Sequence, residues 1–315
     1  MQNNTTDKIY HGLSEDVYDI EKGEIQEGGI TRNKDFKVLV VENDITNSMQ
    51  AMAVAPVDSS GKVDTSKVVI AYAGTSDLND ATIDVTEVVL GLHTRGAQID
   101  TSEKFADKIK KEYPNSTIDF TGHSLGGYLA VHNAARNKSK ATVFNAPDAS
   151  NSLTKEQIED VLKNPGMIKN YRNPRDKIGN YGGDKLGIAI YVDSDVNPYL
   201  MPLDALISIY HTIDSWVNFD KDGNLLDKNG KIAREVDLKE IDIDGDGKID
   251  FRLDRKNLEE EPLFSPIFTE KINGGLEIKI NYESLKHLSN QLINAIKDLE
   301  TALNMLNSAE AYNNE

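Results

Sequence analysis

Residues 121–127 read Thr-Gly-His-Ser-Leu-Gly-Gly and contain the pattern Gly-x-Ser-x-Gly. A serine on a tight turn between a strand and a helix exposes its hydroxyl for nucleophilic attack, and small neighbours let the helix pass the strand. An apolar-ended segment at 116–120 and a small-residue segment at 128–135 supply these two elements. The helix N-terminus also favours developing negative charge. We therefore predict Ser124 as a nucleophile; a chance match to a short pattern is the alternative.

A serine nucleophile needs a base to take its proton and a carboxylate to orient that base. In sheets with this kind of turn the chain order is serine, acid, histidine. Apart from His132 on the nucleophile's own helix, only His211 and His287 follow Ser124. Because His287 lies on a predicted terminal helix, we predict His211 as the base. His123 adjoins the nucleophile and is interpreted as structural.

The orienting acid should lie between Ser124 and His211. Asp176 closely follows an apolar strand predicted at 167–171, so it is the predicted acid, and Asp148 is the alternative because it also follows a strand. The remaining aspartates of this interval are Asp160, Asp184, Asp193, Asp195 and Asp204.

A predicted strand at 68–72 ends in Ala73-Gly74-Thr75. Backbone N–H groups at such a strand end, together with the N–H that follows the nucleophile, can bind the oxyanion of an ester intermediate. We predict Thr75 and Leu125 in this role. The alternative for Thr75 is an ordinary turn from strand to loop.

A separate acidic segment spaces carboxylates at alternate positions, as a calcium loop requires. Its predicted ligands are Asp242, Asp244, Asp246, the carbonyl of Lys248, and Asp250. A full EF-hand would carry Glu where Leu253 stands. We predict a structural Ca²⁺ site with no part in catalysis, and the alternative is a solvated acidic turn.

The elements that position these residues alternate between strands and helices. Strands are predicted at 38–41, 49–57, 68–72, 116–120, 141–144, 167–171 and 187–192, and helices at 12–21, 101–111, 128–135, 154–163 and 203–210. This alternation predicts an α/β fold with a mainly parallel sheet, whose functional residues gather at strand carboxyl ends. Paired hairpins are predicted at 216–236 and an amphipathic helix at 281–312. The apolar stretch 85–92 fits either a lid or a core helix.

Composition excludes several classes of function. The net charge of −17 over 315 residues disfavours nucleic acid and electrostatic docking on anionic lipid, so we expect lipid contact to be apolar and local. Cysteine is absent, which rules out disulfides and thiolate chemistry. The polar first residues lack the basic and apolar regions of a secretory signal.

In order along the chain, residues 70–75, 121–127 and 173–178, followed by His211, resemble the landmarks of class 3 lipases. The resemblance covers roughly 36–220 and implies an α/β-hydrolase fold, a Ser124, Asp176 and His211 triad, and an oxyanion hole at Thr75 and Leu125. Many members carry Arg at the position of Ala73, which leaves open what supports that loop here.

We predict a lipase-like α/β-hydrolase domain over 1–280, with a hairpin and acidic-loop extension at 216–280, and a helical segment at 281–315. An N-terminal lipase domain followed by a leucine-rich helix resembles type VII-secreted bacterial lipase toxins with an LXG-like C-terminal region. That resemblance implies export without a signal peptide, small helical secretion partners and an immunity protein. A packing helix or a coiled-coil arm is the alternative.

Together these features predict a serine carboxylester hydrolase acting on glycerolipids, with triacylglycerol and phospholipid both open. The alternative is a catalytically idle hydrolase-fold protein that serves as an export or partner-binding module.

Overall fold

The computed structural model describes residues 5–74, 92–174, 176, 178–192, 210–216, 218–227, 230–233, 267–272 and 275–280. The chain divides into two compact units, Met1–Lys256 and Asn257–Glu315. Within the second unit, β8 (Ile267–Ile272) and β9 (Gly275–Ile280) form an antiparallel pair. The domain boundary predicted after residue 280 stays a prediction.

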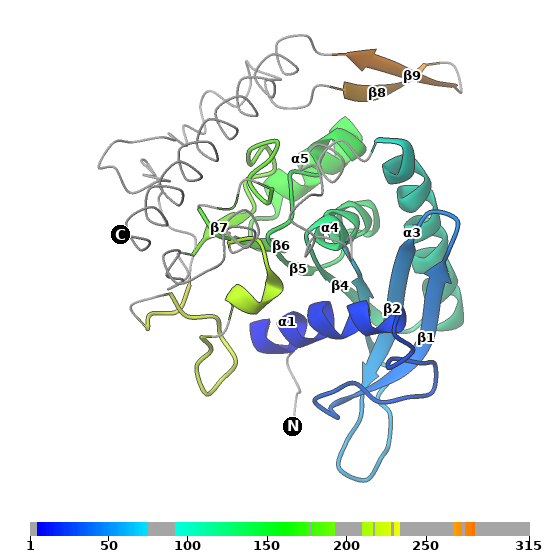
Figure 1. Cartoon of the computed structure of the whole chain (residues 1–315), viewed down its shortest axis with the longest axis vertical. Coiled ribbons are helices and arrows are strands. Elements are labelled where there is room, and N and C mark those ends of the chain that lie inside the picture. Colours follow the sequence, from blue (N-terminus) through cyan, green and yellow to red (C-terminus); the bar gives the residue numbers. More distant parts are fainter. Residues whose placement is uncertain are drawn as a thin grey trace, which may run out of the picture. The chain divides into compact units, whose positions relative to one another are not determined.

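The first unit contains a seven-stranded sheet whose spatial order follows the sequence (Figure 1). The strands are β1 (Phe36–Asp44), β2 (Met49–Pro56), β3 (Lys67–Tyr72), β4 (Thr117–His123), β5 (Ala141–Phe144), β6 (Ile168–Arg172) and β7 (Ala189–Tyr191). The β1–β2 and β2–β3 pairs are antiparallel, and β3 to β7 are parallel. This mainly parallel sheet with connecting helices confirms the predicted α/β-hydrolase fold class.

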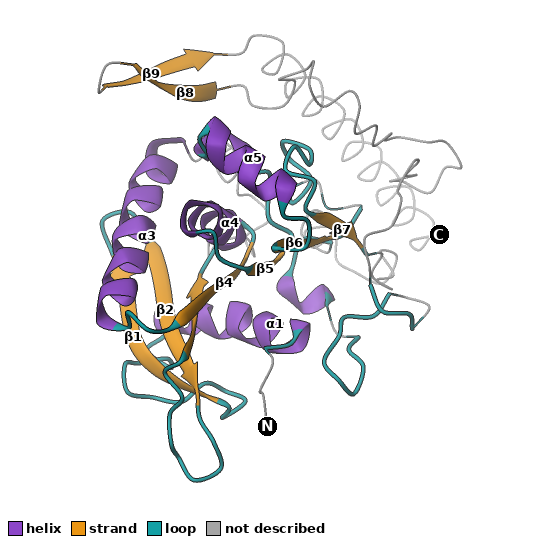
Figure 2. Cartoon of the chain, turned by 180° about the vertical axis from the view of Figure 1, so that it is seen from behind, coloured by secondary structure: helices purple, strands orange, loops and turns teal. Residues whose placement is uncertain are grey.

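The helices cover the two faces of the sheet unequally. The connecting helices α3 (Leu92–Glu112), α4 (Leu125–Asn137) and α5 (Lys155–Lys163) lie on one face, and α1 (Asp7–Asp16) lies on the other (Figure 2). Parallel strands that advance one place at a time by right-handed crossovers put every connecting helix on the same side. The opposite face is thereby left for α1, which packs on β4 and β5.

Alternate residues of β2, β3 and β5 pack into two separate cores. In β3, Ile70 and Tyr72 pack in the cluster that contains Phe105 of α3, whereas Val69 packs in the cluster that contains Leu13 of α1. A strand covered on both faces needs apolar residues at successive positions rather than at alternate ones. This is why the strand segments read as continuous apolar runs.

Several element boundaries differ from the sequence prediction. The first helix begins at Asp7 instead of residue 12, because the Thr6 hydroxyl accepts a hydrogen bond from Ile9 N–H and caps it. It ends at Asp16, and a 3₁₀ turn (Val17–Ile20) follows. Helix α3 begins at Leu92, well before residue 101. Antiparallel bridges at 219–225 and 226–232 agree with the hairpins predicted at 216–236.

Some predicted features lie outside the described residues. These are all but the last residue of the stretch 85–92 and of the helix at 203–210, the acidic segment at 242–250 and the helix at 281–312. Among the helices that the structure does describe, none has the length and apolar character needed to cross a membrane.

Candidate active site

Ser124 occupies a strained turn between β4 and α4. Its φ is 57°, in the left-handed region that a non-glycine residue adopts only when its surroundings enforce it. Its N–H donates to the Phe144 carbonyl over 3.0 Å, which fixes the turn against β5. A β-carbon on Gly122 would lie 2.5 Å from the Gly126 backbone, so this approach of strand and helix requires glycine. This is the predicted tight turn between a strand and a helix that exposes the serine, and residues 122–126 are called the elbow below.

The structure brings three predicted site residues into one hydrogen-bonded line. His211 Nε2 lies 2.8 Å from Ser124 Oγ, and His211 Nδ1 lies 2.8 Å from Asp176 Oδ2. All three side chains are buried. A carboxylate only accepts hydrogen bonds, so His211 Nδ1 carries the proton and Nε2 faces the serine hydroxyl with its lone pair. This geometry makes Ser124 the donor to an unprotonated nitrogen, which is what activation of a hydroxyl requires.

Asp176 sits in the loop after β6 and is held by its own backbone surroundings. The Ile178 N–H donates to its Oδ1 over 2.9 Å. A β-carbon on Gly179 would lie 2.3 Å from its Oδ2, so the loop must pass the carboxylate without a side chain. Oδ1 is thus occupied by the Ile178 N–H, and Oδ2 is the carboxylate oxygen that faces His211.

The alternative acid, Asp148, has different partners. Its carboxylate accepts backbone N–H groups of Ser150 at 3.0 Å and Lys185 at 3.0 Å. Burial raises the pKa of this carboxyl group above that of an exposed aspartate. Asp148 thus fastens the loop at 181–187 to the end of β5, while Asp176 is the carboxylate that contacts the histidine.

Two further residues hold the backbone of His211. Its carbonyl oxygen accepts hydrogen bonds from His123 Nε2 at 2.5 Å and from Asn145 Nδ2 at 3.1 Å. Asn145 Oδ1 in turn accepts from the Asn173 N–H at 2.9 Å, on the loop that carries Asp176. Sequence reasoning assigned Asn145 no role. The available signal was its position directly after β5, where functional residues of parallel sheets collect.

The predicted oxyanion residues are only partly within the described chain. Leu125 is the first residue of α4, where backbone N–H groups have no partner inside the helix. Thr75 lies outside the described residues. Its neighbour Gly74 is close-packed, because a β-carbon there would lie 2.5 Å from Tyr18 Oη and 3.2 Å from Ser124 Cβ. The end of β3 therefore touches the elbow.

Tyr18 supports this strand end. A backbone hydrogen bond joins Gly74 to its hydroxyl, while burial raises the pKa of the phenol well above its usual value. This contact holds the loop that follows Ala73.

The predicted calcium ligands, from Asp242 to Asp250, all lie outside the described residues. Within the described part of the chain, no group of three or more His, Asp or Glu side chains is arranged to hold a metal ion. The calcium site therefore stays a prediction.

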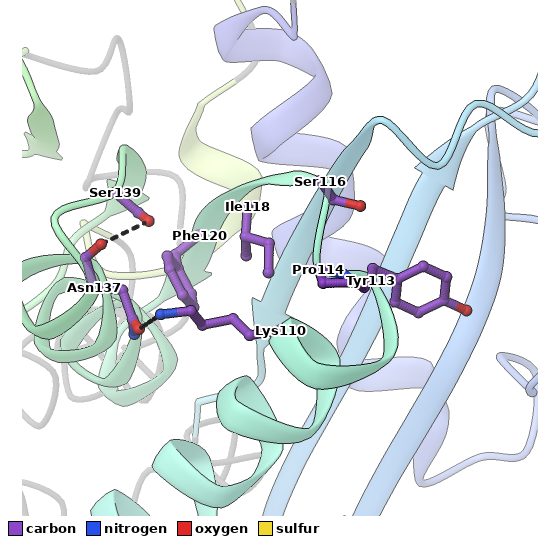
Figure 3. A pocket seen from close by; sticks show the side chains of 8 residues that line it. All are labelled: Lys110, Tyr113, Pro114, Ser116, Ile118, Phe120, Asn137 and Ser139. Carbon is purple, nitrogen blue, oxygen red and sulfur yellow. Dashed lines mark hydrogen bonds between the residues drawn. The ribbon is translucent and has the colours of Figure 1, made fainter.

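A small cavity of about 100 Å³ lies between the end of α3 and the start of β4 (Figure 3). Ile118 and Phe120 form part of its lining, and Lys110 Nζ donates to Asn137 Oδ1 over 2.8 Å at its edge. Ser124 follows the opposite end of β4. This cavity is separate from the candidate site.

The mostly parallel sheet and the serine elbow at the carboxyl end of β4 define an α/β-hydrolase. Residues 10–182, more than half of the chain, match the family model described as phospholipase-like, Tle-like phospholipase domain. The chain belongs to this family and is an ester hydrolase of the lipase and phospholipase class. No curated protein matches it significantly in sequence.

Three fungal lipase structures resemble parts of the chain. The Rhizomucor miehei lipase propeptide complex is 16% identical, with a TM-score of 0.38, and covers 58% of this chain and 66% of its own. A triacylglycerol lipase from Penicillium expansum is 15% identical over 59% and 79%, with a TM-score of 0.36. Lipase II from Rhizopus niveus is 11% identical over 65% and 90%, with a TM-score of 0.41. The fold assignment rests on the strand order and the elbow, not on these partial superpositions.

Proposed function

We propose that this enzyme cleaves acyl esters of glycerophospholipids with Ser124 as nucleophile, His211 as general base and acid, and Asp176 as the group that orients His211. The observation that carries the proposal is the buried series of two hydrogen bonds, each 2.8 Å long, from Ser124 Oγ to His211 and from His211 to Asp176. Phospholipid is favoured over triacylglycerol because the matching family is described as phospholipase-like.

In the first half of the reaction, Ser124 Oγ attacks the ester carbonyl carbon while its proton passes to His211 Nε2. The carbonyl π electrons move to the oxygen and give a tetrahedral oxyanion. When this intermediate collapses, the bond to the alcohol oxygen breaks, and His211 Nε2 returns the proton to that oxygen. The lysolipid leaves and the acyl group stays on Ser124.

In the second half, water attacks the acyl-enzyme and gives its proton to His211 Nε2. Collapse of the second tetrahedral intermediate expels Ser124 Oγ, which takes the proton back, and the fatty acid is released. Throughout, the hydrogen bond between His211 Nδ1 and Asp176 keeps the imidazole in the tautomer that both steps need.

The oxyanion of both intermediates is stabilised by backbone N–H groups. The Leu125 N–H, at the positive end of the α4 dipole, is the first donor. Thr75 is proposed as the second donor. The contact of its neighbour Gly74 with the elbow supports that assignment.

The test compares the parent enzyme with Ser124→Ala on vesicles, with product masses measured. We expect the parent to release fatty acid and lysophospholipid, and Ser124→Ala to lose at least about 10³-fold in rate. A fluorophosphonate probe should label the parent at Ser124. Retained hydrolysis in Ser124→Ala would sink the proposal, and an unlabelled Ser124 would favour the catalytically idle alternative.

Vesicle charge adds a second comparison. Because the protein carries a net charge of −17, anionic vesicles should repel it. We therefore expect faster hydrolysis on zwitterionic than on anionic vesicles of matched acyl chains. The difference should shrink as salt is added, because salt screens the repulsion.

We further propose a role as a secreted bacterial toxin that is neutralised by an immunity protein. The resemblance of the two ends of the chain to type VII-secreted lipase toxins supports this. Growth arrest on expression of the parent, but not of Ser124→Ala, is the expected outcome. Equal growth of the two strains would count against the toxin role.

A further inference from the structure

The base of the proposed triad lies on a segment with little regular structure. Residues 210–216 form a turn and a short 3₁₀ helix (Ile213–Ser215). Side chains from elsewhere hold this backbone: Asn145 Nδ2 donates to the Tyr210 carbonyl at 2.9 Å, and His11 Nε2 to the Ile213 carbonyl at 3.0 Å. The orientation of His211 therefore depends on contacts made by its main chain.

The His211 carbonyl fixes the tautomer of His123. A carbonyl only accepts, so His123 Nε2, at 2.5 Å, must carry the proton. Burial and the neighbouring His211 lower the pKa of His123 well below its usual value, so the ring is neutral with a single N–H. His123 Nδ1 is then an acceptor, and the Tyr18 hydroxyl donates to it at 2.9 Å.

The same chain of hydrogen bonds reaches the strand that precedes Thr75. The Gly74 backbone also forms a hydrogen bond with the Tyr18 hydroxyl. Because the single Tyr18 proton is donated to His123, the phenol oxygen is the acceptor and the Gly74 N–H is the donor. Tyr18 thus has its oxygen fixed by Gly74 and its proton committed to His123. On the far side of the His211 carbonyl, Asn145 continues to the Asn173 N–H.

We propose that Tyr18, His123 and Asn145 are positioning residues that hold the His211 carbonyl and so aim its ring between Ser124 and Asp176. This inference rests on the proposed function of the triad. Tyr18 acts at one remove, by keeping the His123 proton on Nε2, the nitrogen that faces the carbonyl. None of the three contacts the substrate in this scheme, so their loss should lower kcat more than it changes KM.

The first variant, Tyr18→Phe, removes the phenol oxygen from this series of hydrogen bonds. In Tyr18→Phe the His123 proton is free to move to Nδ1, which would leave a nitrogen lone pair facing the His211 carbonyl oxygen. We expect kcat on a soluble aryl ester to fall about 10-fold to 100-fold, with KM nearly unchanged, because small displacements of a reacting group cost rates of this order.

Tyr10→Phe is the matched control. It removes the hydroxyl of another largely buried tyrosine near the N-terminus, one that donates to Asp119 Oδ2 at 2.8 Å and, among the described residues, not to Ser124, Asp176 or His211. We expect it to change the melting temperature while leaving kcat close to that of the parent. A fall in kcat after Tyr18→Phe no larger than after Tyr10→Phe would overturn the proposal.

A second pair of variants tests His123 without relying on Tyr18. The amide nitrogen of Gln can occupy the place of imidazole Nε2, and that of Asn the place of Nδ1. His123→Gln can therefore still donate to the His211 carbonyl, whereas His123→Asn cannot. We expect His123→Gln to keep roughly tenfold more kcat than His123→Asn at similar melting temperatures. Equal kcat values for the two variants would contradict the proposal.

Asn145→Asp tests the other donor. Asp accepts the Asn173 N–H as Asn does and tolerates the φ of 48° at this position, but it cannot donate to carbonyls. We expect a loss of kcat of about 100-fold, again with little change in KM. Unchanged kcat would remove Asn145 from the proposal.

Ser124→Ala and probe labelling, measured in parallel, distinguish a failure of the proposed function from a failure of the positioning roles. Full activity of Ser124→Ala would overturn the proposed function. An inactive Ser124→Ala together with unaffected Tyr18, His123 and Asn145 variants would overturn only the positioning roles.

Discussion

Gly126 faces the carbonyl oxygen of Tyr72 so closely that a β-carbon at Gly126 would lie 2.1 Å from it. The atom in the way belongs to the backbone of β3 and cannot rotate aside, so either the helix or the strand has to move. This contact couples the first turn of α4 to the strand that leads to the predicted oxyanion residue.

Gly126→Ala should therefore destabilise the fold and displace the elbow. We expect a loss of about 3 kcal/mol in the free energy of unfolding, measured in urea, because overpacking against backbone is costly. Gly12→Ala is the control: a β-carbon at Gly12 would meet nothing within 4 Å, and the residue sits inside α1. There the same change should stabilise by about 0.5–1 kcal/mol. A neutral Gly126→Ala would show that the strand and helix separate easily.

Asp176→Asn tests how the tautomer of His211 is set. The Asn amide can donate to His211 Nδ1, which would place the histidine proton on Nε2, where it cannot accept from Ser124. We expect kcat to fall about 10⁴-fold with the fold retained.

Asp148→Asn separates the two candidate acids. It weakens backbone contacts to Ser150 and Lys185, so the melting temperature should fall while kcat stays close to that of the parent. The reverse pattern, with kcat lost in Asp148→Asn and kept in Asp176→Asn, would exchange their roles.

The free energy of unfolding should change with pH because of Asp16. Burial raises its pKa from 3.8 to about 6 in spite of the Arg32 N–H at 3.1 Å. The folded state therefore holds this proton more tightly than the unfolded chain does. Its stabilising contribution is complete below pH 3.8 and is lost as the pH rises through about 6.

Asp16→Asn is uncharged at every pH. The stability gained by this variant over the parent should therefore grow between about pH 4 and pH 7, by about 3 kcal/mol. Urea unfolding of both proteins across this range measures the difference. A constant gap would mean that Asp16 does not titrate in the folded state with a raised pKa.

The predicted calcium site has a direct test in thermal unfolding. We expect Ca²⁺, but not Mg²⁺, to raise the melting temperature, since Ca²⁺ accepts six to eight oxygen ligands in flexible geometries whereas Mg²⁺ demands a near-ideal octahedron. Asp246→Asn should abolish the shift. Hydrolysis of a soluble ester should continue in a chelator at temperatures where the protein stays folded. Loss of activity without unfolding would instead assign the metal a role in catalysis.

Much of the fold could be predicted because strands such as β2, β3 and β5 are covered on both sides. Apolar runs such as 68–72 and 141–144 are conspicuous for that reason, and their alternation with helices left few arrangements of the sheet. The site residues were found by chemistry and order: an elbow sequence, then an aspartate and a histidine in the expected succession.

The supporting residues could not be predicted in this way. Tyr18 meets His123 across 105 residues of sequence, and Asn145 meets the His211 carbonyl across 66. Such contacts produce no periodic pattern in the sequence. Tyr18 can also be interpreted as an ordinary core aromatic residue, and Asn145 as an ordinary turn residue. The early start of α1 was missed because its cap, Thr6, precedes the first apolar position.

The spatial order of the strands also has a consequence in time. Because each strand joins the sheet beside the one made just before it, a chain emerging during synthesis can add strands without rearranging earlier ones. The last of the seven, β7, is finished at Tyr191, whereas His211 is made only afterwards. With His211 as the proposed base, the growing chain holds its sheet and its nucleophile before it can cut a lipid, so hydrolysis is acquired only after the seven-stranded sheet is complete.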